Sequence, residues 1–290
     1  MRLLSGSSNQ KLAQKIIELT GIKNLEREIY NFMDGEIKVS LQDDNLNRKH
    51  IIILQTLSSS NHLIELCLLI DALKNANAKK ISLVIPYFFY TRQDKPKPGE
   101  AFSPKVIIKI LETSGINDIT FLDLHSTKIE NLFSIPTKKL EINTMLKDII
   151  TKDSIIVAPD FGGIPRSENI AKNFNLELIH VDKIRLEAGK VSAKLQETNI
   201  KNKNCLIIDD IIDSGNTICE TARILKDHGA QTVKAFCTHG VLSKDSLSNI
   251  TNSYLDHLFI TNSIDTEEKI RNVKKISVID IAPLIAKSIE

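Results

Sequence analysis

Short apolar runs alternate with amphipathic helical patterns along the whole chain, and this alternation limits the possible folds more than any other feature. The runs are β-branched, about four to eight residues long and bounded by polar residues, which is typical of buried strands. The predicted strands are Ile51 to Gln55, Lys80 to Ile85, Ile119 to Asp123, Ser154 to Pro159, Glu177 to Asp182, Asn204 to Asp210, Gln231 to Thr238, Asp256 to Ile260 and Lys275 to Ile279. The predicted helices are His62 to Ala76, Pro104 to Thr113, Glu141 to Ile150, Pro165 to Asn173 and Thr217 to His228.

Strand, helix and strand in repeated order predict an α/β protein. Short connections imply parallel strands, right-handed crossovers and helices on both faces of the sheet. Ligands of such sheets bind beyond the carboxyl ends of the strands. The polar loops after Asp123, Pro159, Asp182 and Asp210 are therefore the candidate site.

The least patterned stretch between blocks, Ser134 to Lys139, predicts a domain boundary. Domains average roughly 150 residues, so a chain of 290 residues predicts about two of them. We expect an N-terminal domain over residues 1–138 and a C-terminal domain over residues 139–290.

Charge and cysteine content exclude several classes of protein. The 38 basic and 36 acidic residues give a formal net charge of +2, too balanced for a nucleic-acid footprint. The chain has neither an N-terminal apolar signal region nor an apolar run long enough to span a membrane. Its cysteines lack the spacing of a zinc site or disulfide framework. We expect a cytoplasmic protein without nucleic-acid or membrane partners.

The most specific motif runs from Asp209 to Thr217. A turn containing Gly215 opens a predicted helix, where unpaired N–H groups and the hydroxyls of Ser214 and Thr217 suit a phosphate. Asp209 and Asp210 would repel phosphate, and instead suit sugar hydroxyls or a metal ion. The combination fits ribose 5-phosphate. Taken alone, it also fits a helix cap beside a solvated strand end.

A second turn, Asp160-Phe161-Gly162-Gly163, follows a predicted strand and precedes a predicted helix. Consecutive glycines let backbone N–H groups approach an oxyanion, and Asp160 could share a cation with it. A diphosphate with Mg²⁺ would suit this turn. Two glycines after a strand are also an ordinary turn.

In the N-terminal half, four aromatic residues lie beside Arg92, Gln93 and Lys95. Aromatic faces stack on a base, Gln93 can pair with its edge and Arg92 can hold phosphate. The segment predicts a nucleotide site, although aromatic core packing with a polar loop beyond it is the simpler explanation when the segment is taken alone. The chain has no GxxxxGK[ST] motif, so a Walker loop would not hold that nucleotide.

Together these motifs resemble those of the ribose-phosphate pyrophosphokinases, in the same order and over essentially the whole chain. They are Asn31 to Glu36, Tyr90 to Lys95, Phe121 to His125, Asp160 to Gly163, Asp182 to Arg185, and Asp209 to Thr217. The resemblance implies two tandem phosphoribosyltransferase-like domains, each a mainly parallel sheet flanked by helices. The first would bind ATP, and the second would carry the ribose 5-phosphate and diphosphate loops.

The resemblance also implies a role for each matched residue. Transfer of the β,γ-diphosphoryl group of ATP to the C1 hydroxyl of ribose 5-phosphate would use Lys183 and Arg185 as catalytic residues, in a mobile basic loop. The Mg²⁺ ligands would be His125 and Asp160. ATP would be bound by Arg92 and Gln93 and, from a neighbouring subunit, by Phe32, Asp34, Gly35 and Glu36, so a homo-oligomer is expected. The diphosphate loop would be Asp160, Phe161, Gly162 and Gly163. Ribose 5-phosphate would be bound by Arg185, Asp209, Asp210, Asp213, Ser214, Gly215, Asn216 and Thr217.

Taken singly, some of these residues have simpler explanations. His125 alone would be a hydrogen-bonded strand-end histidine, and Lys183 and Arg185 alone would be solvated charges. Two rival functions use the same residues: a phosphoribosyltransferase acting on a nucleobase, and a catalytically silent regulatory subunit. A base transferase has no use for a second nucleotide site, and a silent subunit has no use for competent loops.

The chain departs from the common form of the family at two places. Gly99-Glu100 and the total length are closer to the short archaeal-type enzymes, which leaves inhibition by ADP and activation by phosphate open. Asn216 stands where glycine is frequent. Asparagine tolerates positive φ and can donate to phosphate, so we expect the loop to keep its function.

Overall fold

The computed structural model describes residues 1–43, 45–185, 191–195 and 199–289, with side chains omitted over 182–198. The chain forms two compact units. Unit 1 comprises Met1–Glu141, Ser263–Asp265 and Asp280–Glu290, and unit 2 comprises Ile142–Asn262 and Thr266–Ile279. The first passage between units lies close to the predicted boundary at 138. The last residues return to unit 1, although the sequence pattern placed them in the second domain.

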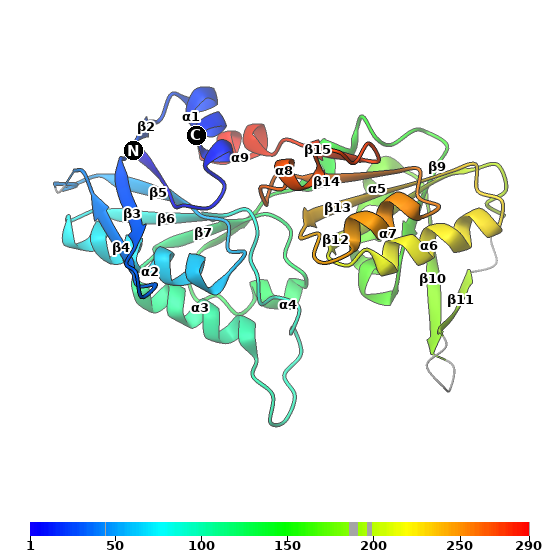
Figure 1. Cartoon of the computed structure of the whole chain (residues 1–290), viewed down its shortest axis with the longest axis horizontal. Coiled ribbons are helices and arrows are strands. Elements are labelled where there is room, and N and C mark those ends of the chain that lie inside the picture. The colour runs from blue at the N-terminus through cyan, green and yellow to red at the C-terminus, as the bar shows by residue number, and fades with distance from the viewer. Residues whose placement is uncertain (44, 186–190, 196–198, 290) are drawn as a thin grey trace. The chain divides into compact units, whose positions relative to one another are not determined.

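Unit 1 is built on a parallel sheet with the strand order β2-β1-β5-β6-β7-β8 (Figure 1). Its strands are β1 (Arg2–Ser5), β2 (Lys23–Asn24), β5 (His50–Leu54), β6 (Lys80–Ile85), β7 (Asp118–Phe121) and β8 (Thr137–Lys139). Its helices are α1 (Gln10–Thr20), α2 (Ser60–Asn75), α3 (Ser103–Ser114), α4 (Thr127–Glu130) and α9 (Ala282–Ile289). Helix α9 belongs to this unit because it packs on α1, where Lys15 Nζ lies 2.9 Å from an Asp280 carboxylate oxygen.

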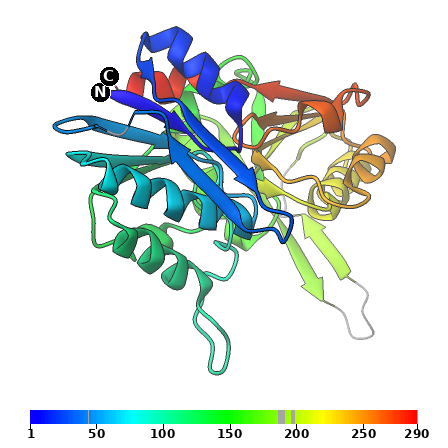
Figure 2. The same ribbon diagram turned by 60° about the vertical axis from the view of Figure 1, so that its left-hand side comes forward.

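A separate antiparallel hairpin joins β3 (Arg27–Asn31) to β4 (Ile37–Leu41). It packs against α2, over which it lies in Figure 2. Strand β3 alternates half-buried and exposed residues, because one face rests on the unit and the other meets solvent.

Unit 2 repeats the sheet order and adds one strand, giving β11-β10-β9-β12-β13-β14-β15. Strands β10 and β11 pair antiparallel, and the other neighbours pair parallel. The strands are β9 (Ser154–Ala158), β10 (Glu177–Arg185), β11 (Val191–Leu195), β12 (Asn204–Ile212), β13 (Thr232–Gly240), β14 (His257–Thr261) and β15 (Ile276–Ile279). The helices are α5 (Ile164–Phe174), α6 (Asn216–Asp227), α7 (Ser246–Asn252) and α8 (Glu267–Ile270), with 3₁₀ turns η1 (Ile142–Leu146) and η2 (Phe161–Gly163).

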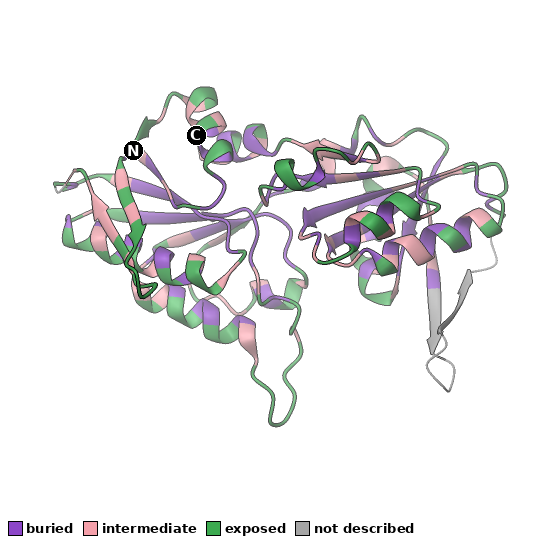
Figure 3. Cartoon of the chain, in the orientation of Figure 1, coloured by how far each residue is buried: buried purple, intermediate pink, exposed green. Residues whose placement is uncertain are grey.

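Each unit has its own apolar core between sheet and helices, and Figure 3 shows buried strands under helices with exposed outer faces. This arrangement is the predicted α/β class, with helices on both sides of mainly parallel sheets. Within the described part of the chain, no helix combines the length and apolar character needed to cross a bilayer.

The predicted elements match the observed ones with one exception. Each predicted strand overlaps an observed strand, but the predicted helix over Glu141 to Ile150 is wrong, because this stretch forms only the 3₁₀ turn η1. Ile142, Asn143 and Thr144 have weak helix propensity, and Ile149 and Ile150 repeat that weakness at the other end.

Candidate active site

The carboxyl edge of the unit 2 sheet collects most of the predicted site residues. Strands β9 and β12 are parallel neighbours, so the segments that follow them emerge at the same edge. The turn Asp160 to Gly163 follows β9, and the loop Asp213 to Thr217 follows β12. Asp209 and Asp210 lie in the last part of β12, which runs two residues further than predicted.

Asp209 and Asp210 form a carboxylate pair that is held away from water. Asp210 is only 3% exposed, and Asp209 accepts a hydrogen bond from the Asp210 backbone N–H at 2.9 Å. Burial raises the pKa of Asp209 well above its usual range, the nearby Asp210 charge adds to this rise, and Arg166 opposes it. The pair therefore favours a proton, a cation or hydroxyl donors.

Arg166, which sequence reasoning missed, is the cation closest to this pair among the described contacts. It projects from α5, and its Nη1 lies 3.6 Å from Oδ1 of Asp210. The arginine side chain is 14% exposed and the aspartate side chain 5%, so the attraction is poorly screened by solvent. Its position one turn into the helix after the glycines was the available signal, since a cation there faces the same sheet edge.

The loop before α6 leaves the start of that helix open. Gly215 caps the helix in the left-handed region at φ +80°, which a glycine adopts without strain. Across the described residues, no side-chain hydrogen bond caps α6. Backbone N–H groups of the first turn and the positive end of the helix dipole are therefore available to an anion.

The turn after β9 is organised by Asp160. Its Oδ1 accepts from the Gly163 backbone N–H at 3.0 Å, so that donor is engaged within the turn rather than presented to an anion. A Cβ at Gly163 would lie 3.2 Å from Cδ of Pro159, a tight contact that glycine avoids. Within the turn, Phe161 is 65% exposed, and its ring lies 5.5 Å from that of His180.

Lys183 and Arg185 are only partly located. Their backbones belong to β10, opposite Ala193 and Val191 of β11, so the chain is a strand here rather than the predicted loop. Their side chains lie outside the described part of the structure.

In unit 1, the predicted ATP residues Phe32, Asp34, Gly35 and Glu36 form the exposed tip of the β3–β4 hairpin. The Phe32 N–H donates to the Glu36 carbonyl at 2.8 Å, and the Glu36 N–H donates to Asp34 Oδ1 at 3.1 Å. Phe32 keeps 47% of its surface exposed, and its ring meets Tyr30 edge-on at 5.2 Å. Asp34-Gly35 between two alternating segments is the sequence signal for this hairpin.

Arg92 and Gln93 are exposed in the turn after β6, and Ser103 Oγ donates to Gln93 Oε1. Tyr90, just before them, has a left-handed backbone at φ +65°, which is rare for a large side chain. Its ring packs 4.1 Å from Phe89, and its hydroxyl lies 3.2 Å from Ser60 Oγ at the start of α2. Strain of this kind persists where surrounding contacts hold it, and it is concentrated at functional sites.

His125 is exposed in the loop between β7 and α4, next to Ser126, which caps α4. Its position follows a strand of unit 1, as predicted. Asp160, the residue predicted to share Mg²⁺ with it, belongs to unit 2.

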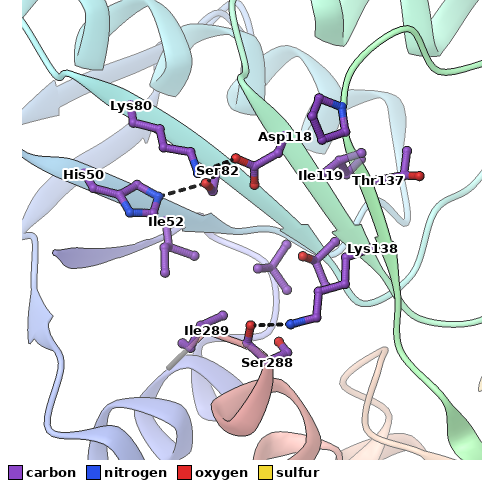
Figure 4. Close-up of a pocket in the computed structure, with 13 residues that line it drawn as sticks. His50, Ile52, Lys80, Ser82, Asp118, Ile119, Thr137, Lys138, Ser288 and Ile289 are labelled. Carbon is purple, nitrogen blue, oxygen red and sulfur yellow. Dashed lines mark hydrogen bonds and ion pairs between the residues drawn. The ribbon is translucent and has the colours of Figure 1, made fainter.

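A pocket of about 390 Å³ in unit 1 lies away from these residues (Figure 4). It opens where strands begin: His50, Lys80 and Asp118 are the first residues of β5, β6 and β7. His50 Nε2 lies 2.8 Å from Ser82 Oγ, which donates to Asp118 at 2.9 Å. The pocket contains none of the predicted site residues.

These observations define the class of the protein. It is a tandem α/β protein whose second unit places an uncapped helix start, a glycine turn and paired carboxylates at one sheet edge, as in proteins that bind phosphorylated sugars. Residues 1–115 match the family described as the N-terminal domain of ribose phosphate pyrophosphokinase, and residues 198–290 match the phosphoribosyl synthetase-associated domain. The chain belongs to the ribose-phosphate pyrophosphokinase family.

Individual relatives agree over the full length. The chain is 37% identical to a ribose-phosphate pyrophosphokinase of Mesorhizobium japonicum, covering 100% of this chain and 96% of the relative. It is 34% identical to one of Ralstonia nicotianae, covering 99% and 93%. The crystal structure of phosphoribosylpyrophosphate synthetase from Mycobacterium smegmatis superposes with a TM-score of 0.92 at 27% identity, covering 99% of this chain and 97% of that one.

Proposed function

We propose that this chain transfers the β,γ-diphosphoryl group of ATP to the C1 hydroxyl of ribose 5-phosphate, giving 5-phosphoribosyl 1-diphosphate and AMP for nucleotide biosynthesis. Full-length similarity to ribose-phosphate pyrophosphokinases supports this reaction. The observation that carries it is the uncapped start of α6 behind Asp209 and Asp210. This arrangement provides donors for the 5-phosphate and acceptors for the sugar hydroxyls.

The loop Asp213 to Thr217 would fix the 5-phosphate, and Asp209 would hold ring hydroxyls. Positioning of this kind can supply several kcal/mol of a reaction barrier. Lys183 and Arg185 would stabilise the charge on the transferring group, and Arg185 can bridge two oxygens. No general base is assigned, because phosphoryl transfer depends mainly on positioning and charge.

Mg²⁺ fits the oxygen donors at the unit 2 edge. Asp160, Asp209 and Asp210 offer hard carboxylate oxygens, and Mg²⁺ commonly binds one or two carboxylates together with substrate phosphates. The described residues contain no group of three or more His, Cys, Asp and Glu suited to a metal ion, so phosphate oxygens would complete the set. His125 is a softer ligand and would act through water more readily than directly. When bound, Mg²⁺ neutralises phosphate charge.

The unit 1 residues would bind ATP. Arg92 can hold phosphate and Gln93 the base edge, while the hairpin tip would reach a neighbouring subunit. Exposure of Phe32 and Met33 at that tip supports a contact with another copy, since exposed apolar clusters mark interaction sites. We therefore propose a homo-oligomer in the cytoplasm, with each ATP site completed across an interface.

The deciding experiment is incubation with ATP and ribose 5-phosphate, with and without Mg²⁺ and inorganic phosphate, followed by detection of AMP and 5-phosphoribosyl diphosphate. AMP formed in step with the diphosphorylated sugar supports the proposal. Consumption of added 5-phosphoribosyl diphosphate with a nucleobase would indicate a phosphoribosyltransferase instead. Absence of both reactions would indicate a silent subunit.

A further inference from the structure

The turn after β13 and the helix α7 contact the phosphate loop through side-chain hydrogen bonds. The turn runs from Gly240 to Asp245, at the carboxyl end of β13, and α7 follows it directly. Ser243 Oγ donates to Asp213 Oδ1. Asn249 of α7 reaches the loop twice, because its Nδ2 donates to the Ser214 carbonyl at 3.0 Å and to Asn216 Oδ1 at 3.2 Å.

The turn itself is conformationally strained. Leu242 and Lys244, on either side of Ser243, have φ of +51° and +50°, a region that side-chain-bearing residues rarely adopt. The Leu242 and Val241 N–H groups both bond to the Ile212 carbonyl, and Leu242 is fully buried. Core packing therefore keeps the strain in place, and the turn presents Ser243 and α7 to the loop at a fixed distance.

The two contacts of Asn249 determine which way the Asn216 amide faces. The Ser214 carbonyl can only accept, so the atom of Asn249 that meets it must be the Nδ2 donor. The same Nδ2 then needs an acceptor on Asn216, which must be Oδ1. The NH₂ group of Asn216 consequently lies on the side of its amide away from the Asn249 contact, at the first position of α6, and none of the described hydrogen bonds uses its two N–H donors.

We propose that Asn249 is a positioning residue that aims the Asn216 amide at the 5-phosphate of ribose 5-phosphate and holds the Ser214 peptide in place. This inference rests on the function proposed above. Neither Asn249 nor Ser243 touches substrate in it. Asn249 acts through Asn216 and Ser214, adding side-chain donors to the backbone N–H groups at the helix start.

The test compares Asn249→Ala, Asn216→Gly and the double variant with the unaltered protein. Asn249→Ala removes both hydrogen bonds from α7 to the loop. We therefore expect it to raise KM for ribose 5-phosphate about tenfold. KM for ATP and the melting temperature of the unliganded protein should change little, since Asn249 is only half-buried and Asn216 is exposed. The rise in melting temperature caused by ribose 5-phosphate should shrink in parallel, and this binding readout does not require turnover.

Asn252→Ala is the matched control, because Asn252 lies on the same helix and its amide donates only to Ser248 Oγ in the described contacts, at 3.3 Å. It should keep normal KM values. The KM of the double variant for ribose 5-phosphate should exceed that of Asn216→Gly by a smaller factor than Asn249→Ala alone produces, since only the contact with Ser214 is then left to lose.

The outcomes separate this inference from the proposed function. If ribose 5-phosphate stabilises the unaltered protein and Asn249→Ala equally, Asn249 is not a positioning residue. Additive effects in the double variant would overturn its action through Asn216. If ribose 5-phosphate fails to stabilise the unaltered protein at any concentration, the proposed function fails and the inference fails with it.

Discussion

The two units share one strand order, but they differ at the start of the helix that follows one equivalent strand. In unit 1, β5 leads into α2, whose cap Ser59 accepts from the His62 N–H at 3.3 Å. In unit 2, β12 leads into α6, whose cap Gly215 has no side chain to offer. A backbone N–H group at the helix start is thus bonded by a side chain in unit 1, whereas the corresponding groups of unit 2 are left for a ligand.

The ends of the strands before these helices also differ, because one carries a neutral hydrogen-bonded side chain and the other carries two carboxyl groups. Gln55 of unit 1 is fully buried, with Nε2 donating to Glu65 at 2.9 Å and Oε1 accepting from Ser8 at 2.7 Å. In unit 2, Asp209 and Asp210 are two adjacent carboxyl groups, and the Asp210 charge helps to raise the pKa of Asp209. Topology therefore provides a sheet edge in both units, but the edge of unit 2 carries the adjacent carboxyl groups and the uncapped helix start that suit a sugar phosphate.

The largest test of this contrast removes the cations assigned to catalysis in unit 2. Lys183→Ala and Arg185→Ala should each lower kcat by on the order of 10³ to 10⁵, as loss of an arginine does in other phosphoryl transfers. Steady-state rates at saturating ATP and ribose 5-phosphate measure this. Lys152→Ala is the control, since Lys152 is exposed just before β9, at the amino edge of the sheet. Near-normal turnover in either variant would show that its cation is not catalytic.

The next test introduces a carboxyl group at the strand end of unit 1, where unit 2 has its carboxylates. Gln55→Glu would place a second buried carboxyl beside Glu65 and remove the amide donor between them, costing roughly 1–3 kcal/mol of stability. Burial and Glu65 would raise the pKa of the introduced carboxyl, so the loss should grow as pH rises from about 4 towards neutral. Thermal unfolding at pH 5 and pH 7.5 measures it. Gln42→Glu is the matched control because Gln42 is exposed. Equal stability of the two variants at pH 7.5 would contradict the closed network around Gln55.

The sequence predicted the chemistry of unit 2 better than its geometry. Asp209 to Thr217 are contiguous, so the residue types alone indicated a strand end and a phosphate loop. Arg166 follows β9, whereas Ser243 and Asn249 follow β13, and no local pattern brings these two segments to that loop. Their role depends on the order β9-β12-β13, which places the segments after those strands beside one another.

Unit 1 shows a different limit of sequence reasoning. The hairpin Arg27 to Leu41 carries an Asp-Gly turn signal and alternating strands, and was predictable from local pattern. Strand β1 and helix α1 also follow ordinary periodicity. By contrast, the docking of α9 on α1 depends on contacts between the two ends of the chain, which no window of sequence contains.

A test with a smaller expected effect removes one carboxyl group, that of Asp209, from unit 2. The pKa of Asp209 is raised in the folded protein, mainly by burial, so the native state binds this proton more tightly than the unfolded chain does. Stability from this group is therefore greatest at acidic pH and is lost as pH rises through the raised pKa. Asp209→Asn removes that loss. Its melting temperature should exceed that of the unaltered protein at neutral pH by a few degrees, at roughly 2–4 °C per kcal/mol, while activity falls.

The pH profile separates this explanation from general stabilisation. Without Mg²⁺, the advantage of Asp209→Asn in melting temperature should shrink as the pH falls below about 4, where the unaltered carboxyl becomes protonated in the unfolded chain as well as in the folded protein. Added Mg²⁺ should narrow the advantage at neutral pH, because the ion would offset the repulsion between the carboxylates. An advantage that does not vary with pH would rule out titration of Asp209 as its cause.

The smallest expected effect concerns Tyr90, which is exposed in the turn after β6 of unit 1. Its hydroxyl contact with Ser60 links the turn carrying Arg92 to the start of α2, and both residues are exposed. Tyr90→Phe removes that link and should raise KM for ATP roughly two- to fivefold, leaving KM for ribose 5-phosphate unchanged. Ser60→Ala should do the same, and the double variant should add nothing further. Tyr254→Phe, at an exposed tyrosine of unit 2, should alter neither constant. If Tyr90→Phe raised both KM values, the turn would affect both substrates, and the assignment of ATP to unit 1 and the sugar to unit 2 would have to be abandoned.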